Sequence, residues 1–208
     1  MQNNPDLEAA FALQTPDENR RLYAEWAATY DDEFAMDMDY MLPLHVAEAY
    51  AAAGGQGPVL DLGAGTGLLG AGLKSSGVGP VDATDLSQEM LDVAGAKGLY
   101  AHLFTGNLMD RLPVEDGAYA GAVSSGTFTH GHVGPEALDE VLRVVRPGGV
   151  VALSINAEHW EAKGYDAHLA KLGPRIADLA VRDVRIYGPE ATGPHAQDLS
   201  RVVTFTRA

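Results

Sequence analysis

A glycine-rich turn between an apolar segment and a helix-forming segment constrains this chain more than any other feature. Residues 59–62 are apolar apart from Asp61, and glycines follow at positions 63, 65 and 67 before an apolar segment begins at Leu68. This order predicts a buried strand, a tight turn and the start of a helix. Glycine lets backbone approach a ligand closely, and a helix start offers free N–H groups with partial positive charge. We therefore expect this turn to bind a polar group of a cofactor.

The glycine spacing fits two cofactor motifs. Residues 65–70 match G-x-G-x-x-G, the dinucleotide fingerprint, whereas residues 61–67 match D-x-G-x-G-x-G. The acid before the turn and the additional glycine favour the second motif, which resembles motif I of class I S-adenosylmethionine-dependent methyltransferases. The resemblance implies S-adenosylmethionine as cofactor, bound by Asp61, Gly63, Ala64, Gly65, Thr66 and Gly67. A nicotinamide-dependent oxidoreductase is the alternative, but the chain has no room for a substrate domain and shows no Tyr-x-x-x-Lys pair at the sheet edge.

Strand and helix signals alternate from Pro58 to the end of the chain. Strands are expected at 58–62, 80–85, 100–105, 118–125, 150–155, 181–187 and 201–206, and segment 158–172 is expected to be helical. Such alternation predicts an α/β fold with a Rossmann-like, doubly wound and mostly parallel sheet. The last two strands are joined by a loop (188–200) without a helix, which predicts antiparallel neighbours. The methyltransferase resemblance implies the same seven-stranded sheet with an antiparallel last strand.

The N-terminal region is predicted to be helical. Residues 15–18, Thr-Pro-Asp-Glu, have the order of a capping box with proline in the first turn. A second helix is expected from Pro43 to Ala53, ended by two glycines. We expect residues 1–57 to form a helical lid or cap and residues 58–208 to form the methyltransferase core, within one structural domain.

Two further segments carry predicted cofactor contacts. Asp85 ends the second expected strand, where an acid can accept hydrogen bonds from ribose hydroxyls, although it can also be a turn acid that caps the next helix. Asn107 stands where many methyltransferases carry an acid that binds the adenine amino group, and its side-chain oxygen can still accept that bond. Leu86 and Leu108 can enclose the adenine, or can simply pack their loops.

The polar segment 123–133 follows the fourth expected strand, at the sheet edge where such folds bind ligands. It contains Ser125, a further candidate for cofactor binding, and two histidines. His130 or His132 can act as a general base because histidine titrates near neutral pH. Either histidine can instead orient backbone, and a metal site is not expected because no acid or cysteine lies nearby.

Segments 26–34 and 126–133 resemble, more closely, the methyltransferase-like family of the Williams–Beuren syndrome region. In related small-molecule methyltransferases, the aromatic residue of an N-terminal Tyr-Asp motif closes over the methionine end of the cofactor. The resemblance therefore implies this role for Tyr30, with Tyr23 and Trp26 as helpers or as core residues. The implied reaction is in-line SN2 methyl transfer, in which the protein mainly aligns the reactants.

Composition restricts the partners. The net charge of −15 creates a surface that repels phosphate backbones, so a nucleic-acid partner is not expected. No apolar run approaches the ~20 residues of a membrane span. The N-terminus lacks the features of a secretory signal, and cysteine is absent, which excludes disulfides and thiolate chemistry. We expect a cytoplasmic enzyme acting on a small molecule, with a cofactor-binding module that lacks catalysis as a further alternative.

Overall fold

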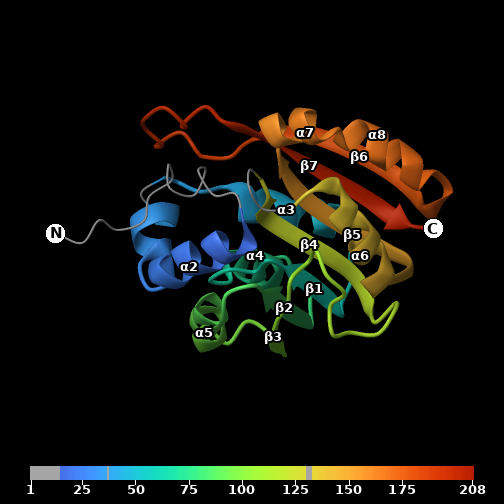
Figure 1. Cartoon of the computed structure of the whole chain (residues 1–208), viewed down its shortest axis with the longest axis horizontal. Coiled ribbons are helices and arrows are strands. Elements are labelled where there is room, and N and C mark those ends of the chain that lie inside the picture. The colour runs from blue at the N-terminus through green and yellow to red at the C-terminus, as the bar shows by residue number, and fades with distance from the viewer. Residues whose placement is uncertain (1–14, 37, 130–132) are drawn as a thin grey trace.

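Seven strands form one sheet at the centre of the computed structural model, which describes residues 15–36, 38–129 and 133–208 (Figure 1). The strands are β1 (Val59–Leu62), β2 (Val81–Asp85), β3 (Leu103–Thr105), β4 (Tyr119–Phe128), β5 (Val145–Asn156), β6 (Ile176–Arg185) and β7 (Leu199–Arg207). Their order in the sheet is β3-β2-β1-β4-β5-β7-β6. Strands β1 to β5 pair in parallel, and β7 is antiparallel to both β5 and β6. The predicted fold class is confirmed.

The order of the strands reverses at β1, which pairs with β2 on one side and with β4 on the other. Open α/β sheets bind ligands beyond the carboxyl ends of the strands at such a point. The glycine-rich turn directly follows β1, so the feature that dominates the sequence also lies at this reversal.

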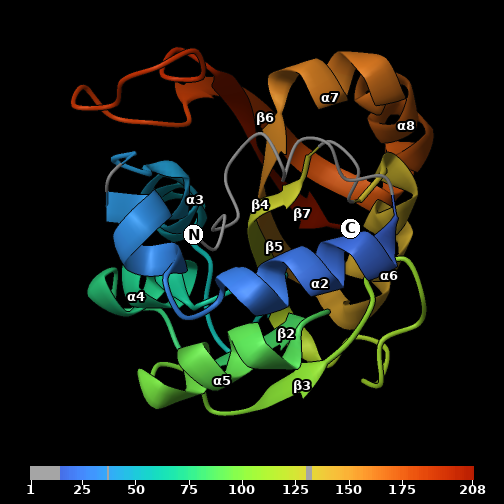
Figure 2. The same cartoon turned by 60° about the vertical axis from the view of Figure 1, so that its left-hand side comes forward.

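Helices cover both faces of the sheet (Figures 1 and 2). They are α2 (Pro16–Trp26), α3 (Leu42–Ala52), α4 (Leu68–Ser75), α5 (Gln88–Ala96), α6 (Leu138–Val144), α7 (Ala157–Lys163) and α8 (Tyr165–Leu172). A π-helix, η1 (Tyr30–Met36), and two short 3₁₀ turns, η2 (Pro135–Ala137) and η3 (Gly173–Arg175), complete the structure. One apolar cluster joins α3 and α4 to the sheet, and a second joins α6, α7 and α8 to its other face. Within the described ranges, no helix has the length and apolar character needed to span a bilayer.

The N-terminal helices differ in how they pack. The capping box at the start of α2 is present: the Glu18 amide donates to Thr15 Oγ1 at 3.3 Å, and the Thr15 amide donates to the Glu18 carboxylate at 3.1 Å. Helix α2 lies beside α5 (Figure 2). Helix α3 instead packs on the sheet, where Val46 and Tyr50 are fully buried. Helix α3 therefore belongs to the layer that covers the sheet, although it lies within the range expected to form a lid.

Several segments differ from their predicted boundaries; β5, for example, begins at Val145 and not at the expected residue 150. The helical segment 158–172 is divided into α7 and α8 at Gly164, whose φ of +68° ends the first helix. Strand β6 begins at Ile176, earlier than the expected residue 181. Its first residues were missed because most of β6 is exposed and a register shift around Asp178, with φ of +55°, breaks the alternation of polar and apolar side chains.

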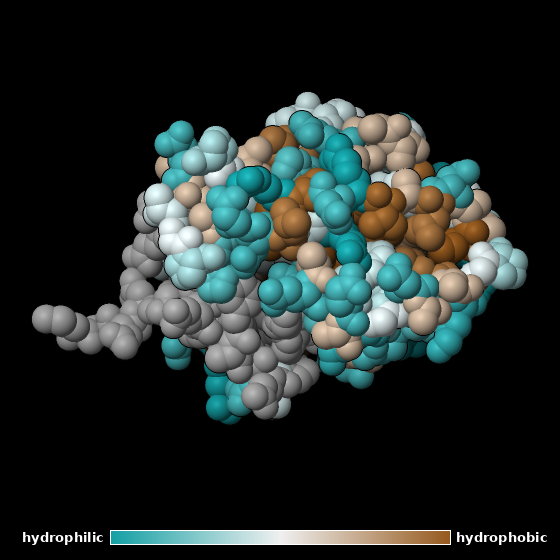
Figure 3. Space-filling view, turned by 90° about the horizontal axis from the view of Figure 1, so that it is seen from above, coloured by the Kyte–Doolittle hydropathy of each residue, from teal (hydrophilic) through white to brown (hydrophobic). Residues whose placement is uncertain are grey.

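Strand β6 forms one edge of the sheet, and Leu179 and Val181 on it are 46% exposed. Figure 3, which views the molecule from above, shows apolar side chains interspersed with polar ones on this side of the molecule. The charged residues Arg182 and Asp183 follow directly in the strand. Charges on an edge strand oppose pairing with another sheet edge.

Gly121, in β4, provides a test of the packing between α3 and the sheet. A Cβ at this position would lie 2.0 Å from the Tyr50 hydroxyl oxygen and 2.5 Å from the Val150 carbonyl oxygen. We expect Gly121→Ala to lower the free energy of unfolding by about 2 kcal/mol through overpacking. Gly95, inside α5, is the control because a Cβ there meets only a Leu103 methyl carbon at 3.8 Å. Gly95→Ala should raise stability by about 0.5 kcal/mol. Urea unfolding measures both; equal effects would contradict this account of the packing.

Candidate cofactor site

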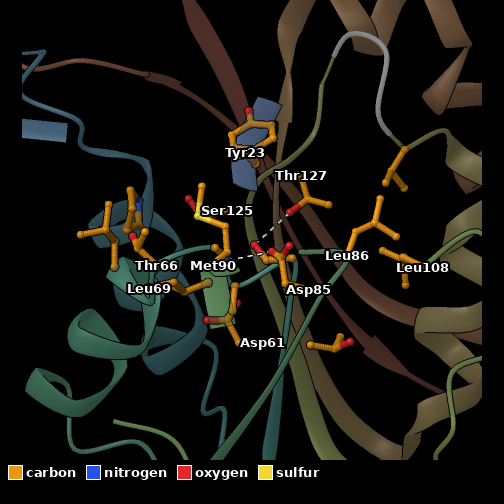
Figure 4. Close-up of a pocket in the computed structure, with 18 of the residues that line it drawn as sticks. Tyr23, Asp61, Thr66, Leu69, Asp85, Leu86, Met90, Leu108, Ser125 and Thr127 are labelled. Atoms are coloured by element: carbon orange, nitrogen blue, oxygen red, sulfur yellow. Dashed lines mark hydrogen bonds between the residues drawn. The ribbon is translucent and has the colours of Figure 1, made fainter. Parts of the chain in front are cut away.

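A cleft opens where β1, β2 and β4 end (Figure 4). It contains about 1070 Å³ of space not filled by protein atoms, including its open mouth. The described lining is mainly apolar and aromatic and holds two carboxylates, with no Lys, Arg or His side chain among them. The lining includes every predicted cofactor residue except Gly67: Tyr30, Asp61, Gly63, Ala64, Gly65, Thr66, Asp85, Leu86, Asn107, Leu108 and Ser125.

The glycine-rich turn forms the floor of the cleft. The amides of Gly63 and Ala64 both donate to the Thr84 carbonyl, at 2.8 and 3.0 Å, which fastens the turn to β2. A Cβ on Gly63 would lie 2.2 Å from Thr127 Oγ1, so a side chain is excluded there by close packing. Gly65 has φ of +53°, and no atom lies within 4 Å of the position that its Cβ would take. The backbone at Gly65 therefore borders open space, as a surface that holds a ligand must.

Asp85 connects the turn to the end of β2. One carboxylate oxygen accepts from the Gly65 amide at 2.8 Å, and the other accepts from the Ser87 amide at 2.9 Å. Burial raises the pKa of Asp85, and these backbone hydrogen bonds oppose the rise. Each carboxylate oxygen has a second lone pair, so Asp85 can hold the turn and still accept hydrogen bonds from a ligand.

Asp61 lies beneath the turn and is fully buried. Its Oδ2 accepts from the Tyr100 hydroxyl at 2.7 Å, and its Oδ1 has no hydrogen-bond partner among the described residues. Burial raises the pKa of Asp61 to about 7, against the lowering effect of the Tyr100 hydrogen bond. The Gly65 amide of the turn is held by Asp85 and not by Asp61. The Oδ1 atom of Asp61 is therefore a buried acceptor that lacks a partner in the described chain.

The predicted adenine side of the cleft is lined by Leu86, Asn107 and Leu108. The two leucines lie on the other side of Asp85 from Thr66 (Figure 4). The Asn107 side-chain oxygen accepts from the Met109 amide at 3.0 Å, and its nitrogen donates to Asp110 at 2.9 Å. Asn107 thus forms a local turn that shapes this side, while its oxygen retains a second lone pair.

Three tyrosines line another part of the cleft, which we call the tyrosine wall: Tyr23, Tyr30 and Tyr40. Trp26 is only 3% exposed and packs edge-on against Tyr30, with ring centroids 5.1 Å apart, so Trp26 supports the wall from the core. Burial raises the pKa of Tyr40 to about 12 and that of Tyr30 further, so both remain neutral phenols at physiological pH.

His130 and His132, the proposed general bases, lie outside the described residues. The segment that follows them is anchored at Val133, whose carbonyl oxygen lies 2.9 Å from His159 Nε2 and accepts from the Tyr165 hydroxyl at 3.1 Å. In the described part of the chain, no three His, Cys, Asp or Glu side chains group as metal ligands.

Three residues of the site were missed by the sequence analysis. Tyr100 holds Asp61, Tyr40 lines the cleft, and Thr127 donates to the Leu62 carbonyl at 3.1 Å where it packs against Gly63. Thr127 lies in the polar segment already identified after β4. Nothing in the sequence near Tyr40 or Tyr100 connects these residues to the glycine turn, because each is brought to it from a distant element.

The fold is the one typical of class I S-adenosylmethionine-dependent methyltransferases. Residues 59–149 match the family described as a methyltransferase domain. Methyltransferase-like protein 27 of Homo sapiens is 31% identical over 71% of this chain, which spans 62% of that protein. Demethylmenaquinone methyltransferase of Clavibacter sepedonicus is 27% identical over 83% of this chain and 73% of its own. Among solved structures, the cyclase SpnF matches with a TM-score of 0.68 at 16% identity, over 94% of this chain and 97% of its own. The matched range resembles a methyltransferase domain, and S-adenosylmethionine is the cofactor that this match implies.

The cleft fits this cofactor on three observations. The buried Asp61 Oδ1, without a partner in the described chain, suits an ammonium group. No protein atom lies within 4 Å of the position that a Gly65 Cβ would take, so a ligand can contact the backbone there. The tyrosine wall offers ring faces that attract a sulfonium cation.

The raised pKa of Asp61 predicts a specific dependence of stability on pH. Between the unfolded value near 4 and the folded value of about 7, the folded chain keeps a proton that the unfolded chain has lost. Stability should therefore fall as pH rises through this window and stay low above it. Asp61→Asn cannot ionise, so at pH 8 it should be more stable than the wild type by about 2 kcal/mol, with the advantage absent at pH 4.

Urea unfolding at pH 4, 6 and 8 measures this effect. Asp92→Asn, on the exposed side of α5, is the matched control and should follow the wild-type profile. Parallel profiles for Asp61→Asn and the wild type would contradict the raised pKa of this carboxyl.

Proposed function

We propose that the chain transfers a methyl group from S-adenosylmethionine to a small-molecule acceptor. The observation that carries the proposal is the floor of the cleft, which is lined by the bare glycine backbone at Gly65, the buried Asp61 and the half-buried Asp85. The bound cofactor supplies a methyl group activated by its attachment to a sulfonium. The protein supplies binding, alignment and the exclusion of water.

Each lining segment takes a part in binding. Asp61 accepts from the ammonium group of the methionine end, using the oxygen that Tyr100 leaves available. Asp85 accepts from the ribose hydroxyls with its remaining lone pairs while it holds the glycine turn. Leu86 and Leu108 enclose the adenine, and Asn107 accepts from its amino group. Ala64, Thr66 and Ser125 complete the surface, whereas Gly67, the N-cap of α4, does not line the cleft.

The tyrosine wall closes the methyl-donor side. Tyr30, supported by Trp26, covers the sulfonium region and keeps water away from it. The neutral phenols of Tyr30 and Tyr40 offer hydrogen bonds without acting as bases. If the acceptor needs a base, we assign that role to His130 or His132, which follow β4 in the sequence.

The acceptor is a small molecule on two grounds. The chain carries a net charge of −15, and the described lining has carboxylates but no cationic side chain, so a polyanion has little to bind. The cleft is concave and mainly apolar and aromatic with a few polar groups, as is typical of small-molecule sites. The match to the human methyltransferase-like protein 27 supports a likeness to methyltransferase-like proteins.

Within the range 1–57, the part that serves as the lid is α2 with η1. Tyr23 and Tyr30 from these two elements line the cleft, whereas α3 is buried against the sheet. We place the core of the enzyme from α3 onward and expect the division into lid and core to lie between Met36 and Leu42.

Substitution of Gly65 tests the cofactor assignment. We expect Gly65→Leu to weaken S-adenosylhomocysteine binding at least about a hundredfold, because the side chain fills the space above the turn. Gly77→Leu is the matched control: Gly77 also has positive φ and open space around its Cβ position, but it follows α4 outside the cleft. Both variants lose similar backbone stability, and only Gly65→Leu should lose binding in isothermal calorimetry. Equal dissociation constants for the two variants would remove the assignment.

A further inference from the structure

Asp31, the residue after Tyr30, contacts two segments of the protein: the glycine-rich turn and the carboxyl end of α5. Its Oδ1 accepts from the Thr66 hydroxyl at 2.6 Å, and its Oδ2 forms an ion pair with the Lys97 ammonium. Thr66 belongs to the glycine-rich turn, and Lys97 caps the carboxyl end of α5. Neither partner is near Asp31 in sequence, so these contacts exist only when η1 lies against the turn.

The turn is thereby held from two sides. Asp85 accepts the Gly65 amide from the β2 side, and Asp31 accepts the hydroxyl of the next residue, Thr66, from the η1 side. Thr66 is 1% exposed, and its hydrogen bond to a carboxylate is the stronger, charge-assisted kind. The Lys97 ion pair is about 30% exposed and contributes less.

We propose that Asp31 is a positioning residue. Through its hydrogen bond with Thr66, it holds η1, whose Tyr30 forms the cover of the cleft, against the turn on which the cofactor rests. Tyr30, its neighbour in η1, lines the cleft, so one carboxylate couples the position of the cover to the shape of the turn. The inference rests on the proposed function, because it assumes that the turn binds S-adenosylmethionine. Thr66 accordingly acts by its hydrogen bond to the cover as well as by lining the cleft.

This coupling predicts a kinetic effect. A cofactor enters while the cover is unfastened, and it leaves only after the contact between Asp31 and Thr66 opens. Loss of the contact should therefore raise the dissociation rate of S-adenosylhomocysteine and change its association rate little. A contact that only stabilises the fold would change the melting temperature and leave the dissociation rate unchanged.

The experiment measures association and dissociation of S-adenosylhomocysteine by surface plasmon resonance on immobilised protein, with circular dichroism melting for each variant. Asp31→Ala and Thr66→Val each remove the hydrogen bond and should raise the dissociation rate about tenfold, as loss of one charge-assisted bond implies. Thr66→Ser keeps the donor and should restore the wild-type rate. Lys97→Met should raise the rate about twofold. Lys74→Met, at an exposed position in α4, is its control.

The double variant Asp31→Ala/Thr66→Val decides the coupling. Because both substitutions break the same hydrogen bond, the double variant should dissociate no faster than Asp31→Ala, and at most about twofold faster than Thr66→Val, which keeps the Lys97 ion pair. Single variants within twofold of the wild type, a hundredfold effect in the double variant, or a Thr66→Ser variant that behaves like Thr66→Val would each overturn the proposal. Thr66→Val, which preserves shape, answers the question if Asp31→Ala fails to fold. A wild-type protein that does not bind S-adenosylhomocysteine would overturn the proposed function and this inference together.

Discussion

The two hydrogen bonds that backbone amides donate to Asp85 determine the geometry of the site. Gly65 and Ser87 lie in different segments, the turn after β1 and the start of α5, and one carboxylate holds both amides. The parallel pairing of β1 with β2 brings these segments together, because parallel strands end at the same sheet edge. The positive φ angles of the turn then point the backbone toward the cleft. Sheet register, glycine conformation and the acid at the end of β2 are therefore parts of one arrangement.

The same arrangement also buries a carboxyl group, Asp61, whose burial lowers the stability of the folded protein. Asp61 is fully buried, and one of its oxygens is unused in the described chain, which costs stability without a ligand. Tyr100 offsets part of this cost through its hydrogen bond. Residues that are destabilising on their own but arranged around a cavity are typical of binding sites, where the ligand completes the polar contacts.

The sequence predicted those parts of the site that are formed locally. The strand, turn and helix around Gly65 follow from residues that are neighbours in the chain, and the capping box at Thr15 depends on residues three positions apart. The fold class followed from alternating signals and was confirmed. Tyr40, Tyr100 and the contact between Asp31 and Thr66 could not be predicted, because residues 20 to 70 positions apart meet only in the tertiary structure and no periodic pattern marks their pairing. The exposed first half of β6 was missed because its burial does not alternate.

The family match separates two parts of the cleft along the chain. The methyltransferase-domain match covers residues 59–149, which contain the turn, Asp85 and the adenine side of the cleft. The wall above this floor comes largely from outside that range, since Tyr23, Tyr30 and Tyr40 precede residue 59. A fold that is also found in the cyclase SpnF does not by itself determine the reaction. The matched range thus contains the floor of the cleft, whereas the tyrosine wall lies outside it. Asp31 joins the two parts, because it belongs to the wall segment and accepts its hydrogen bond from the floor.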